Sequence, residues 1–165
     1  MKMRLTDCTF VHMTQQSVGD ILGVCSVGER IVTGSKKVPE IVMAKLHQLF
    51  STSKSSEFPS VADLKKVLMQ KYNTSMTKEE EETFMIAFAG YCCAYMFGPP
   101  ERSAYVPKRL WEFICEPTNL EKCNWSEYVL STIRESAVNV QMKLMKTTSE
   151  PNSIKLGGYW LYLEV

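Results

Sequence analysis

The side chains best suited to bind a metal or to act as nucleophiles are six cysteines and two histidines. Zinc sites usually take their ligands in pairs spaced roughly two to four residues apart. Here the cysteines stand singly, except for the neighbours Cys92 and Cys93, and His12 and His47 are widely separated. Cys8 and His12 would share one face of a helix, but two ligands do not complete a site. We therefore predict no bound metal ion.

Catalysis through a covalent intermediate needs a nucleophile, a base and a group that orients the base. Neither histidine lies in a signature of such a site, so we predict a non-enzymatic protein with no catalytic residue. Residues 28–37 loosely resemble a phosphate-binding loop. The true pattern, G-x-x-x-x-G-K, has a lysine directly after its second glycine, whereas here five residues separate the glycines and Ser35 precedes Lys36. A turn before a helix at Pro39 fits better, and we expect no cofactor.

The composition indicates which class of molecule the chain binds: protein, nucleic acid or lipid. The chain has 165 residues and a net charge of +1, with 45% hydrophobic and 22% charged residues. This length suits one domain, and the near-neutral charge argues against a surface dedicated to nucleic acid or to anionic lipid. The paired lysines at 36–37 and 65–66 have no interleaved aromatic residues, so we interpret them as solvated. We therefore expect a protein partner rather than a nucleic acid.

The longest apolar run extends from Phe84 to Phe97 and follows four glutamates. Its fourteen residues are fewer than the roughly 20 that span a bilayer, so we predict a buried core helix and no membrane association. Residues 1–13 show neither a secretory signal nor a mitochondrial presequence. We accordingly expect the nucleus or the cytoplasm, where all six cysteines would remain free thiols.

Start signals for helices recur along the chain. Ser60 can cap one helix, and Thr77 forms a capping box with Glu80 ahead of the apolar run. Asn124 and Glu127 form a second capping box before the longest amphipathic pattern. Further helices are predicted over residues 14–22, from Pro39 onward, and from Pro107 to a stop at Pro117.

These elements predict a single-domain all-α fold, a bundle or array of about six to eight helices. The fold allows for one short extended segment, within residues 23–33 or in the apolar segment 159–165. We expect the core to be built on residues 84–97, Trp111 and Trp125.

The order of several segments is similar to that of the aminotransferase-like plant mobile domain, a transposon-derived plant family often found upstream of a SUMO-protease-like domain. The matching segments are Val18–Gly23, Ser26–Gly28, Thr77–Phe97, Pro107–Trp111, Asn124–Leu130 and Gly157–Leu163. The resemblance covers residues 14–165 and leaves 1–13 as an N-terminal extension. It implies an all-α domain of plant origin and supplies no catalytic residues. Relatives continue beyond the last segment, and we expect no inherited protease function.

The resemblance and the missing catalytic signatures favour a protein-interaction or regulatory domain derived from a plant transposable element. Two alternatives remain: a nucleic-acid-associated module of transposon origin, and a selfish-element toxin or antidote that binds one host protein. The partner would be an unidentified protein, with self-association as a further alternative.

The last segment concentrates aromatic residues near the end of the sequence, where an undocked chain would expose them to water. Exposed aromatic residues are frequent anchors of interfaces, and methionines suit adaptable binding surfaces. The predicted interaction surface consists of Met142, Met145, Tyr159, Trp160 and Tyr162.

Overall fold

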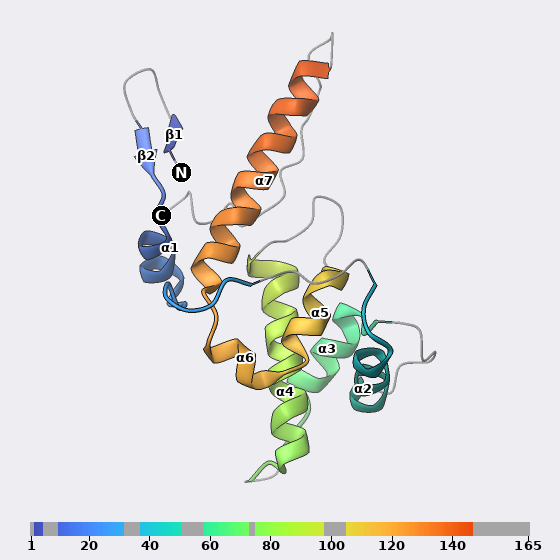
Figure 1. Ribbon diagram of the computed structural model, residues 1–165. Coiled ribbons are helices and arrows are strands. Elements are labelled where there is room, and N and C mark those ends of the chain that lie inside the picture. Colours follow the sequence, from blue (N-terminus) through green and yellow to red (C-terminus); the bar gives the residue numbers. More distant parts are fainter. Residues whose placement is uncertain are drawn as a thin grey trace. The chain divides into compact units, whose positions relative to one another are not determined.

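The computed structural model describes residues 2–4, 10–31, 37–50, 58–72, 75–97 and 105–146, which Figure 1 shows as coloured ribbons. These residues form seven α-helices, one π-helix and two strands of three residues each. The predicted all-α class is therefore confirmed, and the number of described helices lies within the predicted range.

The chain forms two compact units, and neither is a continuous stretch of sequence. The first unit comprises residues 1–31, 97–103 and 123–165, and the second comprises residues 32–96 and 104–122. Residues 1–13 fall within the first unit. The predicted division into an N-terminal extension and a domain over 14–165 stays a prediction.

The first unit is organised around one long helix. Its described elements are β1 (Lys2–Arg4), β2 (Phe10–His12), α1 (Gln15–Leu22) and α7 (Trp125–Lys146). The two strands pair antiparallel, with Lys2 opposite His12. Helix α1 lies beside the N-terminal part of α7, and the rest of α7 extends past it (Figure 1).

Close contact between α1 and α7 depends on a glycine. A Cβ atom at Gly19 would lie 3.0 Å from Ser126 Oγ and 3.0 Å from the carbonyl oxygen of Val24. Helix α1 then ends at Leu22 and is capped by Gly23, whose φ of 65° is the left-handed conformation that favours glycine. The chain can therefore turn back toward the start of α7.

Asn124 connects that turn to α7. Its Oδ1 accepts a hydrogen bond from the Glu127 amide at 2.9 Å, which caps the helix as predicted. Its Nδ2 donates to Ser26 O at 3.0 Å and to Gln15 Oε1 at 3.1 Å. The backbone N–H of Asn124 donates to Glu29 O at 2.9 Å.

The other half of the predicted capping box takes a different form. A reciprocal bond would run from the Asn124 amide to the Glu127 side chain. In the structure the Glu127 carboxylate lies 3.3 Å from Arg30 Nε. The backbone N–H of Asn124 and the Glu127 carboxylate are thus bound by Glu29 and Arg30 instead of by each other.

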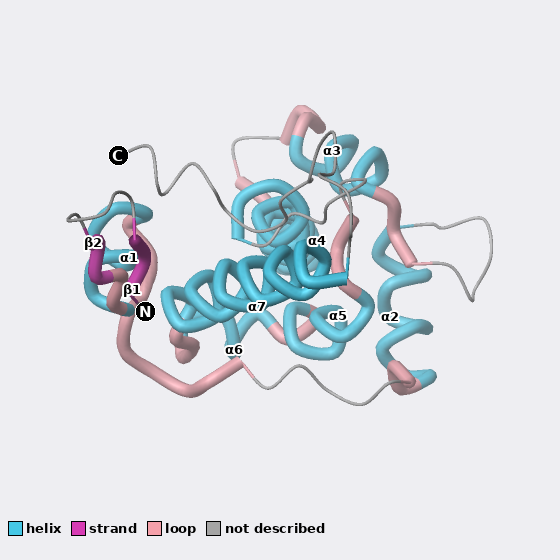
Figure 2. The backbone as a smooth tube through the Cα atoms, turned by 90° about the horizontal axis from the view of Figure 1, so that it is seen from above, coloured by secondary structure: helices cyan, strands magenta, loops and turns pink. Residues whose placement is uncertain are grey.

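The second unit packs around α4. Its elements are α2 (Glu40–Phe50), α3 (Val61–Leu68), α4 (Lys78–Cys92), η1 (Cys93–Phe97), α5 (Lys108–Ile114) and α6 (Pro117–Glu121). Helix α4 contacts α3, α5 and α6 (Figure 2). The π-helix η1 continues α4, and its last residue, Phe97, belongs to the first unit, where its ring lies 5.3 Å from that of Trp125.

Local signals placed most helix starts in this unit correctly. Ser60 and Thr77 each accept a hydrogen bond from the amide three residues ahead, as predicted. Pro117 was predicted to stop a helix, but that helix ends at Ile114 and Pro117 begins α6. Proline suits a first helical position because the amide that it lacks would have no intrahelical partner there.

The core of the second unit is centred on Trp111, which is fully buried together with Leu110 and Ile114. The Phe58 ring stacks on Trp111 with 6.3 Å between ring centroids, and Lys108 Nζ lies 5.5 Å from the centroid of Phe58. Trp111 and, in the first unit, Trp125 are buried as predicted. The residues of the apolar run 84–97 are only partly buried, because Phe88, Tyr95 and Met96 are exposed.

Candidate functional site

Helix α4 and the π-helix η1 bury Ile86 and most of their small side chains, but they leave large aromatic side chains exposed. Ala87, Cys93 and Ala94 are fully buried, as is the backbone around Gly90, where an added Cβ would lie 3.0 Å from Leu64 Cδ1. By contrast, Phe88 is 56% exposed. A core helix normally buries its bulkiest apolar residues, so packing within the unit does not account for this face.

The exposed face carries four aromatic residues in a row, which we call the aromatic ridge: Phe84, Phe88, Tyr91 and Tyr95. Their spacing of four, three and four residues places side chains on one side of a helix. The Tyr91 and Tyr95 rings lie 4.7 Å apart, so the row continues from α4 into η1. Tyr95 is 46% exposed, and Phe84 and Tyr91 are half-buried.

The ridge is fixed at its N-terminal end by the second unit itself. Tyr72, just after α3, packs edge-on against Phe84 with 5.9 Å between centroids. The Tyr72 hydroxyl donates to Val67 O at 2.8 Å. Burial, with a smaller contribution from the nearby Glu80 carboxylate, raises the pKa of Tyr72 above its usual value.

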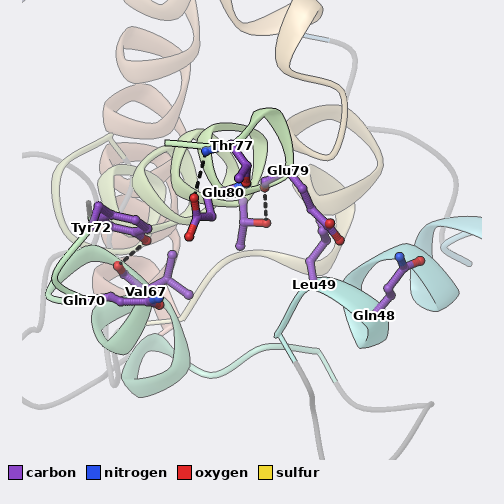
Figure 3. A pocket seen from close by; sticks show the side chains of 9 residues that line it. Gln48, Leu49, Val67, Gln70, Tyr72, Thr77, Glu79 and Glu80 are labelled. Atoms are coloured by element: carbon purple, nitrogen blue, oxygen red, sulfur yellow. Dashed lines mark hydrogen bonds between the residues drawn. The ribbon is translucent and has the colours of Figure 1, made fainter. Parts of the chain in front are cut away.

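Next to Tyr72 lies an open cleft of about 410 Å³. The ends of α2 and α3 and the start of α4 form its walls (Figure 3). The lining residues are Gln48, Leu49, Val67, Gln70, Tyr72, Thr77, Glu79, Glu80 and Thr83. Two of these groups are already engaged, because Glu80 accepts from the Thr77 amide at 2.8 Å and Thr83 Oγ1 donates to Glu79 O at 2.7 Å.

The interaction surface predicted from the sequence lies elsewhere in the chain. Met142 and Met145 are on α7, with 46% and 85% of their surfaces exposed. Together with Val138 they follow a helical spacing opposite the buried Val129 and Ile133. The other three predicted residues, Tyr159, Trp160 and Tyr162, lie outside the described residues, so the proposed surface stays a prediction.

Sequence reasoning missed the ridge because it assigned the whole apolar run to the core. Hydropathy alone cannot separate the two faces of a helix that is apolar all round. A usable signal was present: the aromatic residues recur at helical spacing, while the positions between them are mostly alanine, glycine and cysteine. Small residues allow close helix packing, which leaves the large side chains on the outer face.

The groups considered for metal binding and catalysis do not assemble within the described residues. No three side chains of histidine, cysteine, aspartate or glutamate converge there. His12 ends strand β2 rather than lying on a helix, and Cys8 lies outside the described residues. In the loop resembling a phosphate site, residues 32–36 lie outside the described parts of the chain.

The buried cysteines are poor nucleophiles. Cys92, Cys93, Cys115 and Cys123 are buried, whereas Cys25 is exposed. Burial raises the pKa of the thiols of Cys92 and Cys123, and it raises that of Cys115 to about 12 despite the nearby Lys45. A thiol acts as a nucleophile only as the thiolate, so these side chains serve as small apolar core residues at neutral pH.

Comparison with known proteins gives a family without an assigned activity. The family described as "Domain of unknown function (DUF8566)" matches residues 1–163, so the chain belongs to it. No curated protein and no solved structure matches the chain. None of the described helices has both the length and the hydropathy needed to cross a membrane.

Proposed function

We propose that this chain is a non-enzymatic protein-interaction domain whose aromatic ridge binds a helix of a partner protein. The observation that carries the proposal is the exposure of Phe88 and Tyr95 on α4 and η1, which bury alanine, glycine and cysteine. Aromatic side chains are frequent binding anchors because each buries a large area with few rotatable bonds. An exposed row of them offers anchors already held in place.

The shape of the ridge favours a helical segment as its occupant. Side chains repeated at helical spacing form a straight row, and such rows pack into the grooves between side chains of a second helix. Recognition of an amphipathic helix is a common mode of peptide binding, with anchors at the same spacing on the partner. The contact between Tyr91 and Tyr95 helps to fix the row before binding.

The biological setting is proposed from the resemblance to the plant mobile domain. The resemblance favours a regulatory protein that is derived from a plant transposable element and acts in the nucleus or the cytoplasm. A toxin or antidote that acts by binding one host protein would be a special case of the same activity. The nucleic-acid alternative receives less support, because the net charge is only +1.

Affinity capture from plant extract treated with nuclease tests this function. The immobilised chain should retain one dominant protein, and the double variant Phe88→Ser/Tyr95→Ser should retain at least about tenfold less, since each lost anchor typically weakens binding by this much. Both positions are exposed, so the variant should keep its thermal stability to within about 0.5 kcal/mol.

The matched control changes the other exposed apolar face. Met142→Ser/Met145→Ser removes two exposed side chains from α7 and should leave the capture unchanged. Equal retention by the Phe88/Tyr95 variant, with its fold intact, would contradict the proposal. A protein lost only with the α7 variant would instead assign binding to the methionine face.

A further inference from the structure

The aromatic ridge has one charged end and one uncharged end. At its N-terminal end, Lys78, Glu79 and Glu81 are exposed. Glu82 is engaged separately, because its carboxylate lies 2.6 Å from Lys45 Nζ. At the other end, residues 93–97 carry no charged side chain. Charged side chains therefore lie at one end of the ridge only.

The polar cleft lies at that same charged end. Glu79 and Glu80 line it from α4, Gln48 lines it from α2, and Gln70 lines it from the turn after α3 (Figure 3). Amide oxygens and carboxylates accept hydrogen bonds, and a carboxylate can accept from several donors at once. A volume of about 410 Å³ is large enough to admit one long side chain.

Tyr72 makes the cleft and the ridge one continuous surface. It lines the cleft, and its ring also contacts Phe84, the first residue of the ridge. A partner that packs on Phe84 and Phe88 would thus bring its adjoining residues over the opening. The two features can be occupied by a single segment.

We infer that the occupant of this surface is an amphipathic helix with apolar residues along the ridge and arginine at the end that lies over the cleft. This inference rests on the proposed function and adds the chemistry of the partner. Arginine fits because its planar guanidinium presents five donors to carboxylate and amide oxygens. An acidic segment would be repelled by Glu79 and Glu81.

The orientation follows from the helix dipoles. The N-terminus of α4 carries a partial positive charge, and a helix C-terminus carries a partial negative one. An antiparallel partner would place its C-terminus beside the start of α4, and basic residues are stabilising in the last turn of a helix. The arginine is therefore expected near the C-terminal end of the bound helix.

Selection from a phage-displayed library of random peptides, each long enough for about four helical turns, tests the inference. Peptides that bind the wild-type chain but not Phe88→Ser/Tyr95→Ser should be amphipathic, with arginine enriched near their C-terminal ends. Against Glu79→Lys/Glu81→Lys this enrichment should disappear, and a selected basic peptide should bind about tenfold more weakly. That variant leaves the Thr77–Glu80 cap intact.

Four results would count against the inference, and they separate the two proposals. Ridge-dependent peptides without basic enrichment would overturn the inference while leaving the proposed function standing. Basic peptides that bind Glu79→Lys/Glu81→Lys as tightly as the wild-type chain would also overturn the inference and leave the proposed function standing. If no selected peptide depends on Phe88 and Tyr95, both the inference and the ridge as a binding surface are wrong. Selection of sequences similar to α7 would also overturn the inference, because a second copy of this chain would then be the occupant.

Discussion

Asn124→Ala should lower the free energy of unfolding by about 2–3 kcal/mol. The substitution removes the N-terminal cap of α7, worth about 1 kcal/mol, and leaves the amide of Glu127 without its acceptor. It also removes the donor to Ser26 O and to Gln15 Oε1. Asn124 is only 6% exposed, so water compensates poorly, and a buried polar group left unpaired costs about 1–3 kcal/mol.

Denaturant unfolding of the purified protein measures this loss, with two variants as controls. Asn124→Ser keeps a hydroxyl acceptor that can cap α7 but loses the amide donor, so it should fall between wild type and Asn124→Ala. Gln15→Ala removes only one acceptor of the Asn124 amide, at a half-buried position, and should lower the free energy of unfolding less than either Asn124 variant. If Asn124→Ala stays within about 0.5 kcal/mol of wild type, as most surface changes do, Asn124 does not hold the turn to α7.

Trp111→Ala should be the most destabilising single substitution in the second unit, by about 3–5 kcal/mol. Trp111 is fully buried and stacks on Phe58, so truncation leaves a large cavity and removes that ring contact. Thermal unfolding should show a fall of roughly 2–4 °C for each kcal/mol in a chain of this size. The smaller change Trp111→Phe keeps a ring against Phe58 and should recover more than half of the loss. A Trp111→Ala protein that melts within a few degrees of wild type would show that this position is not the centre of the core.

Features of the fold that depend on neighbouring residues could be predicted from the sequence. The caps at Ser60, Thr77 and Asn124 need only a side-chain acceptor a few residues from a free amide, so a short sequence pattern identifies them. The short strands lack such patterns, and the proline that begins α6 is also typical of the residues that follow a helix. Three-residue strands fall below the length at which alternation is readable.

Features that depend on distant residues could not be predicted. Asn124 was identified as a cap, but its bonds to Ser26 and Gln15 join segments about a hundred residues apart. The exposure of Phe88 likewise depends on which side of α4 meets α3 and α5. The sequence contained the spacing of the ridge, but only the packed helices show which face is outward.

The most direct test of the ridge as a binding surface is site-specific photocrosslinking. A photoreactive phenylalanine analogue replaces Phe88 in one protein and Met145 in another, and each is irradiated in plant extract. The ridge position should crosslink to a single partner protein, within a segment that forms an amphipathic helix, and the α7 position should not. Crosslinks to a partner from position 145 and none from position 88 would contradict the account.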